Sequence, residues 1–415
     1  PALTTANHIT HPEGYISWIN NVGHSIIESI RFEIDENIFI SDDFPYGYWL
    51  DIFNELNDID NSEYIQLGKF ENNKEKDIYN NQPISLEVPL HLWMSDYTRN
   101  AFPFFLLENG TLKIRIKLRG LSEIIYFNPG SDTLGNSATV IAGIQPIMNL
   151  NVGYYQINDA NLKARLQNQN YTLYFNSYSH RKIAINNADG LIDAIPTKDS
   201  SNPIKQIDIV FVDQSRDTGA SDFSAPGNLI EINSIFSHTN NNDYFNYGRT
   251  ARFEGDFHSF KTLQFKYNNI DYFDTVLRAP FIQSTYSRDN NISVPRKKVY
   301  PISFTPRPHD GEIYGLLDVQ PSSSLTFQIT DIQTGSNMYI FYTQVVKLNI
   351  FARELYVDNW GTRRGTFRNT GFRFADSHLD QSTAAICEAQ KIEENITNEL
   401  ERISSQTTIF DRFLV

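Results

Sequence analysis

The sequence predicts an all-β protein of two β-sandwich or β-barrel domains, with a few short helices inserted in its loops. Two observations support this fold class. Short runs of β-branched and aromatic residues recur along the chain, and several of them alternate apolar with polar side chains. Asn, Asp, Gly and Pro interrupt these runs about every ten residues, a spacing typical of sandwiches and barrels.

The expected strands follow one another along most of the chain. The clearest is 111–119, where apolar residues alternate with cations, so that one face is buried and the other faces water. In chain order, the pattern predicts strands at residues 29–34, 37–40, 84–93, 111–119, 123–127, 148–157, 171–178, 205–212, 261–267, 299–305, 324–330, 338–343 and 347–351.

Two short helices are expected within the β-rich part of the chain. Asp42 and Asp43 can cap a segment that has Pro45 in its first turn and apolar residues at helical spacing up to Leu56. Asp159 can cap a second helix, for which the pattern predicts residues 160–169. Both helices are interpreted as insertions in the loops of a β fold.

A third, amphipathic helix is predicted in the C-terminal tail, over residues 377–406. Its apolar face consists of Ala385, Ile386, Ala389, Ile392, Ile396, Leu400 and Ile403. We expect residues 379–403 to pack on a neighbouring or underlying protein; the alternative is a helix folded back on its own subunit.

The chain divides best at a polar segment that contains Pro and Ser, residues 195–202 (IPTKDSSN), which separates two β-rich parts of similar size. The predicted units are a first β domain over 1–195, a second over 203–375 and the helical tail over 376–415.

Composition excludes several classes of protein. The 415 residues include 29 Phe and 22 Tyr, enough for large cores, while 20% charged residues are too few for a disordered polyelectrolyte. The net charge of −14 argues against a surface that binds nucleic acid. Cys387 is the only cysteine, so the fold is expected to stand without disulfides or a Cys-based zinc site. No apolar run approaches the roughly 18 residues of a membrane-spanning helix.

No group of residues predicts catalysis or a cofactor. The chain has neither a Gly-rich phosphate loop nor a G-x-S-x-G motif. Two patterns could bind a metal, but only weakly. The first, at Asp58, Asp60, Ser62 and Glu63, is better interpreted as a solvated turn after a helix. The second, at His8 and His11, lies in a segment without helical periodicity. The basic clusters at 296–298 and 363–368 are interpreted as local salt bridges at domain edges. We therefore expect no metal, no cofactor and no enzyme activity.

Four Asn-x-Ser/Thr sequons are candidate glycosylation sites: Asn109, Asn170, Asn291 and Asn395.

Residues 23–56 read GHSIIESIRFEIDENIFISDDFPYGYWLDIFNEL. This order of strand, turn, short strand and helix resembles the first jelly roll of the major capsid proteins of large nucleocytoplasmic double-stranded DNA viruses, whose helix has a W-x-D-I-W-N-E-L character. The matching residues are Trp49, Asp51, Ile52, Asn54, Glu55 and Leu56, with Phe53 in place of the second Trp.

Further segments extend the resemblance over most of residues 1–365. They are 88–93 (VPLHLW), 102–118, 299–304, 324–330 and 347–361, the last with an aromatic-Ala-Arg step at Phe351, Ala352 and Arg353. The chain departs from the family at two turns: Asp35 and Glu36 replace a Gly pair, and Asp310 and Gly311 replace a Pro-Ser-Gly turn. The alignment also implies that the opening strand of the first jelly roll lies before Pro1.

The resemblance implies a double jelly roll, that is, two eight-stranded antiparallel sandwiches. It further implies a homotrimer that forms a pseudo-hexagonal capsomer of an icosahedral virion shell, assembled in the host cytoplasm. The expected partners are neighbouring capsomers, minor capsid proteins and an internal membrane, with no direct contact to nucleic acid. Two alternatives remain open at this point: a trimeric scaffolding protein of the same fold, and a β-sandwich protein that binds or hydrolyses carbohydrate.

Overall fold

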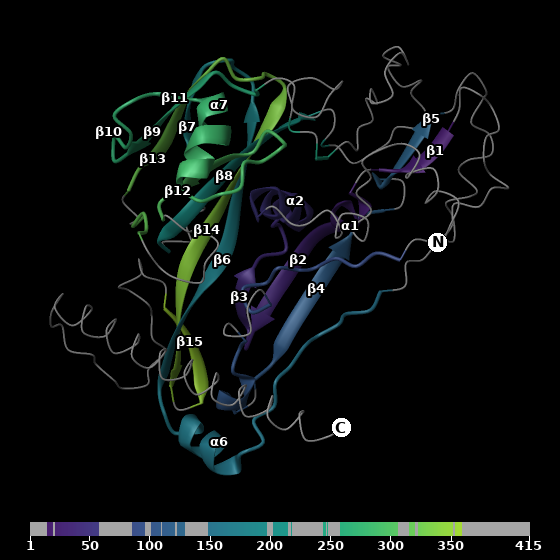
Figure 1. Cartoon of the computed structure of the whole chain (residues 1–415), viewed down its shortest axis with the longest axis vertical. Helices are drawn as coiled ribbons and strands as arrows, with labels where there is room; N and C mark the ends of the chain where they lie inside the picture. The colour runs from purple at the N-terminus through teal and green to yellow at the C-terminus, as the bar shows by residue number, and fades with distance from the viewer. Residues whose placement is uncertain are drawn as a thin grey trace, which may run out of the picture.

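The computed structural model describes residues 15–19, 21–57, 85–95, 101–108, 110–120, 123–128, 148–196, 202–214, 217, 244–245, 247, 258–305, 315–319, 323–351 and 353–358. In this part of the chain the strands form antiparallel sheets, joined by short helices (Figure 1). The all-β prediction is therefore confirmed. The predicted tail helix at 377–406 lies outside the described residues.

Four sheets make up the described structure. A two-stranded sheet pairs β1 (Tyr15–Trp18) with β5 (Ile125–Asn128). The β2 sheet has the order β3–β2–β4, with β2 at Ile27–Ile34, β3 at Asn37–Ile40 and β4 at Leu112–Leu118. The β9 sheet contains β7 (Gly190–Asp193), β9 (Thr262–Tyr267), β10 (Ile270–Asp271), β11 (Leu277–Arg278) and β13 (Leu325–Thr330).

The central sheet is organised around one long strand, β14 (Ser336–Phe351), of 16 residues. It pairs along its length with β6 (Tyr171–Ile185), and its other edge pairs first with β8 (Ile204–Asp213) and then with β15 (Glu354–Asp358). A further strand, β12 (Tyr300–Ser303), lies on the far side of β8. The sequence predicts two strands in place of β14, whereas the structure joins them without a break.

Both faces of the central sheet are buried where β8 and β14 run together. On β8, Ile207, Ile209 and Phe211 belong to one hydrophobic cluster, core 2, whereas Val210 and Val212 belong to another, core 1. Core 2 lies between the central sheet and the β9 sheet, and core 1 lies on the opposite face, with α2 and the β2 sheet. The near-continuous apolar character of 207–212 follows from this burial on both faces.

The remaining elements are short. The main helix, α2 (Tyr46–Asn57), follows the expected Pro45 and packs on core 1, next to the one-turn helix α1 (Val22–Ser25). The helix α6 (Ala160–Gln167) begins as predicted, because the Asp159 side chain accepts hydrogen bonds from two backbone N–H groups. The other helical turns are η3 (Phe104–Leu106), α7 (Ala279–Phe281), the π-turn η6 (Ile282–Tyr286) and α8 (Ser287–Asp289).

Two predicted strands are absent from the sheets of the described residues. Residues 85–92 are irregular and lead into a turn at 93–95, so the predicted strand 84–93 is wrong in this structure. Residues 148–159 are extended but have no strand partner among the described residues.

Strands from both sides of the predicted 195–202 linker share sheets: β6 pairs with β14, and β7 pairs with β13. The proposed domain limits themselves stay a prediction.

The start of α2 lies close to α1 and β2 because residue 47 is glycine. A Cβ atom there would lie 2.5 Å from the carbonyl oxygen of His24 and 2.5 Å from that of Ile27. Both atoms belong to the backbone of buried elements and cannot move away independently.

We expect Gly47→Ala to lower the free energy of unfolding by about 2–3 kcal/mol, because α2 must shift away from the sheet to admit the methyl group. Urea denaturation measures the loss. Gly190→Ala is the matched control, since a Cβ atom at Gly190 meets nothing within 4 Å. Equal effects of the two substitutions would show that the close approach of α2 does not limit stability.

The β2–β3 hairpin turns through two residues in the left-handed region. Asp35 has φ 48° and Glu36 has φ 68°. The Asp35 carboxylate accepts hydrogen bonds from the backbone N–H and the hydroxyl of Thr111. These bonds offset part of the conformational free energy that the positive φ of Asp35 costs. Glu36 is exposed and has no such contact among the described residues.

Glu36→Gly is expected to raise the free energy of unfolding by about 1 kcal/mol, because glycine adopts positive φ without the Cβ penalty. Thermal unfolding monitored by circular dichroism measures the gain. Glu36→Ala removes the same carboxylate but keeps the Cβ atom, so it should give no such gain; equal stabilisation by both variants would refute the explanation.

Candidate functional site

The structure places some of the sequence-predicted residues and leaves others outside its described part. Asn170 is exposed immediately before β6, and Asn291 is exposed after α8 with φ 55°. Their glycosylation stays a prediction. Outside the described residues lie Asn109, Asn395, His8, His11, the 58–63 segment and the basic cluster at 363–368. Within the described residues, no group of three or more His, Cys, Asp or Glu side chains could hold a metal ion.

The buried polar residues that join α2 to the second half of the chain form the most distinctive cluster, which we call the junction. At its centre, Lys297 Nζ lies 2.8 Å from one carboxylate oxygen of Asp51 and 2.9 Å from the other. The side chains are only 5% and 1% exposed, respectively. Asp51 also accepts hydrogen bonds from the Asn21 amide at 2.7 Å and the Tyr247 hydroxyl at 2.9 Å.

One helical turn after Asp51, Glu55 continues the junction. Its carboxylate accepts the backbone N–H groups of Arg296 at 3.0 Å and Lys297 at 3.3 Å. Residues four apart lie on the same face of a helix, so both acids of α2 meet the segment just before β12. The 296–298 cluster was predicted to form local salt bridges at a domain edge; Lys297 does form a salt bridge, but its partner Asp51 is distant in sequence and the pair is buried.

Aromatic rings enclose the Lys297–Asp51 pair. The Lys297 Nζ atom is 5.2 Å from the ring centroid of Phe245 and 5.6 Å from that of Tyr247. Burial, and then the negative charge of Asp51, raise the pKa of Tyr247 well above its ordinary value. The Tyr247 hydroxyl therefore stays protonated and acts as a hydrogen-bond donor to Asp51.

A third acid, Asp217, connects the first turn of α2 to the central sheet. Its carboxylate accepts hydrogen bonds from the hydroxyls of Tyr48 at 2.8 Å and Tyr339 at 2.6 Å. It also accepts a hydrogen bond from Asn337 at 2.7 Å and pairs with Lys182 at 2.6 Å. Burial is the main cause that raises the pKa of both tyrosines, so they remain donors at physiological pH.

A further buried acid, Asp208, lies on β8, between β12 and β14. Asp208 is opposite Pro301 on one side and Phe341 on the other, and it accepts a hydrogen bond of 2.5 Å from Gln206. Burial raises the pKa of Asp208 to about 7, and the hydrogen bond from Gln206 offsets part of this rise.

The junction joins the two parts of the chain in a fixed orientation. The carboxylates of Asp51, Glu55 and Asp217 each accept hydrogen bonds from segments distant in sequence, which leaves little freedom for α2 to move relative to the central sheet. Its chemistry is that of a rigid connection. Sequence reasoning did not single out Asp51 and Glu55 as partners of Lys297, although two acids on the apolar face of a helix are a signal that buried cations or donors must meet them.

Comparison with known proteins finds one matching family and several similar folds. Residues 1–158 match the family described as major capsid protein N-terminus. No curated protein sequence matches the chain. Among solved structures, the chain resembles PBCV-1 VP54, in a crystal structure fitted into a cryo-EM reconstruction of the virophage Sputnik. The TM-score is 0.56 at 15% identity, and the match covers 83% of this chain and 86% of that chain.

A quasi-atomic model of the PBCV-1 virus capsid gives a similar result, with a TM-score of 0.55, 14% identity, and 82% and 87% of the two chains covered. At 14–15% identity, the similarity to these structures establishes the fold of the chain and nothing further. The chain is thus a double jelly-roll protein. The match of residues 1–158 to the family described as major capsid protein N-terminus confirms the resemblance found in the sequence, and one of the similar solved structures is a model of a virus capsid.

Proposed function

We propose that this chain is a major capsid protein that self-assembles into homotrimeric, pseudo-hexagonal capsomers of an icosahedral virus shell. Three chains with two jelly rolls each would present six similar domains around a threefold axis, which is the geometry that such a shell needs. Support comes from the double jelly-roll fold and from the match to the major capsid protein family.

The single observation that carries the proposal is the rigid connection between the two parts of the chain. The central sheet contributes to both hydrophobic cores, and the Asp51–Lys297 pair locks α2 against the residues before β12. A pseudo-hexagonal outline needs a constant angle between the two jelly rolls of each subunit. A subunit with a hinge at this position would give capsomers of variable shape.

The partners of the trimer are proposed from the same family match and fold. The trimer would contact neighbouring capsomers, minor capsid proteins and an internal membrane, in a virion assembled in the host cytoplasm. The net charge of −14 disfavours direct contact with the genome. We expect purified trimers to show no binding to double-stranded DNA at physiological salt in a filter-binding or mobility-shift assay; salt-sensitive binding would refute this point.

The mass of the purified protein in solution tests the proposal directly. Light scattering coupled to size exclusion should give a stable species of three times 47.8 kDa. A monomer at micromolar concentration would contradict it. Detection of the chain in purified virions would then distinguish a capsid protein from a scaffolding protein of the same fold, which leaves before maturation.

A further inference from the structure

The Lys297–Asp51 pair of the junction consists of a primary amine and a carboxyl group held in contact. The Nζ atom lies 2.8 Å from one carboxylate oxygen and 2.9 Å from the other. Because the carboxyl carbon Cγ is bonded to both oxygens, Nζ lies within roughly 3.3 Å of this carbon, the separation of a near-attack pair. An amine and a carboxyl group are the reactants of amide formation, and here they lie at reacting distance.

The surroundings of the pair exclude water. The two side chains are only 5% and 1% exposed, and the rings of Phe245 and Tyr247 lie near Nζ. In water, the hydration of the ammonium and carboxylate groups opposes their condensation. Burial has already removed most of this hydration, and a buried ion pair carries a desolvation cost that a neutral amide does not. The site therefore lowers the main thermodynamic obstacle to an amide bond.

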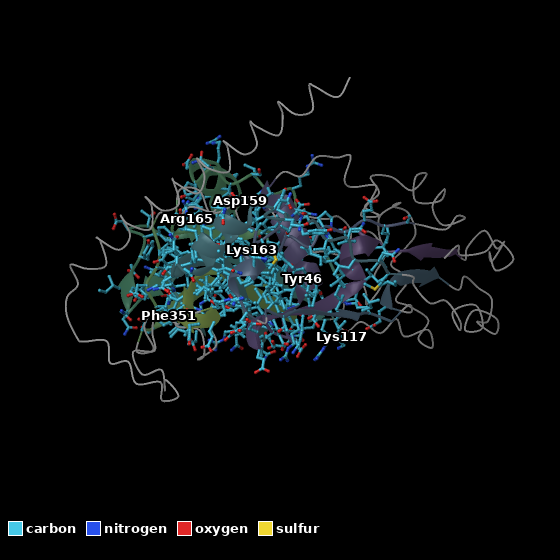
Figure 2. All side chains as sticks on the ribbon, turned by 90° about the horizontal axis from the view of Figure 1, so that it is seen from below. Tyr46, Lys117, Asp159, Lys163, Arg165 and Phe351 are labelled. Carbon is cyan, nitrogen blue, oxygen red and sulfur yellow. The ribbon has the colours of Figure 1, made fainter. Side chains whose placement is uncertain are left out.

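The surface pair Lys117–Glu28 shows why contact alone is not enough. Its N–O distance of 2.6 Å is shorter, but its side chains are 66% and 39% exposed. Figure 2 shows Lys117 at the rim of the molecule, whereas Tyr46, the first residue of α2, lies in the interior. Water hydrates both groups of the surface pair and keeps them ionised. The junction pair differs because it combines contact with burial.

Each oxygen of Asp51 has its own hydrogen-bond donor. The Asn21 amide donates to Oδ1 at 2.7 Å, and the Tyr247 hydroxyl donates to Oδ2 at 2.9 Å. Attack on a carboxyl carbon places negative charge on one oxygen and makes the other the leaving group, and donors fixed in advance stabilise both changes. The Glu55 carboxylate holds the backbone N–H of Lys297 at 3.3 Å, which also fixes the main chain of the attacking residue.

From this geometry we infer that Lys297 and Asp51 condense to an intrachain isopeptide bond, which links α2 covalently to the segment before β12. The ion pair is the reactant. One proton passes from Nζ to Oδ2, which leaves a neutral amine and a carboxylic acid. Rotation of the carboxyl group about its Cβ–Cγ bond, a soft torsion, turns the face of Cγ towards the Nζ lone pair.

The bond changes balance without a co-reactant. The Nζ–Cγ bond forms while the carbonyl electron pair moves to Oδ1, beside the Asn21 amide. The Cγ–Oδ2 bond then breaks as a second proton passes from Nζ to Oδ2, and Oδ2 leaves as water. One C–N bond replaces one C–O bond, and no group is oxidised or reduced.

The isopeptide bond closes a covalent loop between positions 246 residues apart. A cross-link of this kind restricts the unfolded chain, as a disulfide does, in a protein whose only cysteine is Cys387. The inference concerns a single chain and does not depend on the proposed shell assembly.

Intact mass spectrometry of the purified full chain tests the inference. After overnight incubation of the folded protein and then denaturation, we expect a main species lighter than the sequence mass by one molecule of water. Digestion with trypsin should release a branched peptide that contains both Asp51 and Lys297. On a denaturing gel the looped chain should migrate faster than a linear one. A wild-type chain that is folded by circular dichroism but has the full sequence mass would overturn the inference.

Two variants serve as matched controls. Lys297→Arg keeps the cation beside Asp51, but its guanidinium stays protonated and does not attack, so this variant should have its full sequence mass. Lys298→Met changes the neighbouring residue and should still lose water. In the wild type, Lys117 should appear only in linear peptides.

The remaining outcomes are also decisive. A loss of water that persists in Lys297→Arg would come from another reaction, such as cyclisation of an aspartate to a succinimide, and would overturn the inference. If Lys297→Arg does not fold, the wild-type digest decides, because the branched peptide is identified without any variant. The oligomer mass is recorded on the same samples. A trimer of full-mass chains would refute the isopeptide bond alone, and a cross-linked monomer would refute the proposed assembly alone.

Discussion

Replacing Lys297 by methionine is expected to lower the free energy of unfolding by about 3–5 kcal/mol, the largest effect of any single substitution proposed for this protein. The change keeps the length and apolar stem of the side chain but removes its charge. Asp51 would remain buried with only its hydrogen-bond donors, and Asn21 and Tyr247 cannot neutralise a carboxylate at a site that is 1% exposed.

The loss is measured by denaturant unfolding, together with the mass of the oligomer in solution. Lys298→Met is the matched control, because Lys298 is adjacent and only partly buried, with a hydrogen bond of 3.4 Å to Gln283. A control as damaging as Lys297→Met would contradict the central role of the ion pair. The double variant Asp51→Asn/Lys297→Met removes both charges and should recover part of the loss.

Asp208→Asn is expected to stabilise the protein far more at pH 8 than at pH 5. Burial raises the pKa of Asp208 to about 7 in the folded chain, whereas the unfolded chain has the ordinary value of about 4. The folded state therefore holds a proton that the unfolded state has already lost. This difference lowers the stability of the wild type as pH rises from about 4 to about 7, and the loss is complete above that window.

Two pH units separate pH 5 from the folded-state pKa, so the gain from Asp208→Asn should be about 2–3 kcal/mol larger at pH 8 than at pH 5. Urea unfolding at the two pH values measures it. Asp274→Asn, at an exposed position of the β9–β11 region, is the control substitution. A gain that is the same at both pH values would mean that Asp208 titrates normally in the folded protein.

Local features of the fold could be predicted from the sequence because short-range physics decides them. Three examples are the Asp159 cap, the helix after Pro45 and the alternation of 112–118. Each depends on residues within a single helix or strand. The division of β14 into strands 338–343 and 347–351 was wrong because the ladder with β6 continues without a break through residues 344–346. The strand β7 was not predicted because its four residues, GLID, carry too little periodicity, whereas the equally short β3 was predicted with its bounds.

The junction could be predicted only in part. The basic cluster at 296–298 indicated salt bridges, but Asp51 and Lys297 are 246 positions apart, and no local pattern specifies such a contact. The double jelly roll came from a resemblance to a family and not from periodicity, because alternation alone does not distinguish sandwich topologies.

The order of strands in the central sheet has a consequence for biosynthesis. Because β14 lies between β6 and β8 and comes last of the three in the chain, neither earlier strand obtains its main ladder until residues 336–351 have left the ribosome. Nascent subunits therefore carry two strands without their main ladder from the synthesis of β8, which ends at Asp213, until β14 is complete at Phe351. In a cell that makes large amounts of this chain, the yield of competent subunits would depend on how fast the last strand arrives relative to encounters between unfinished neighbours.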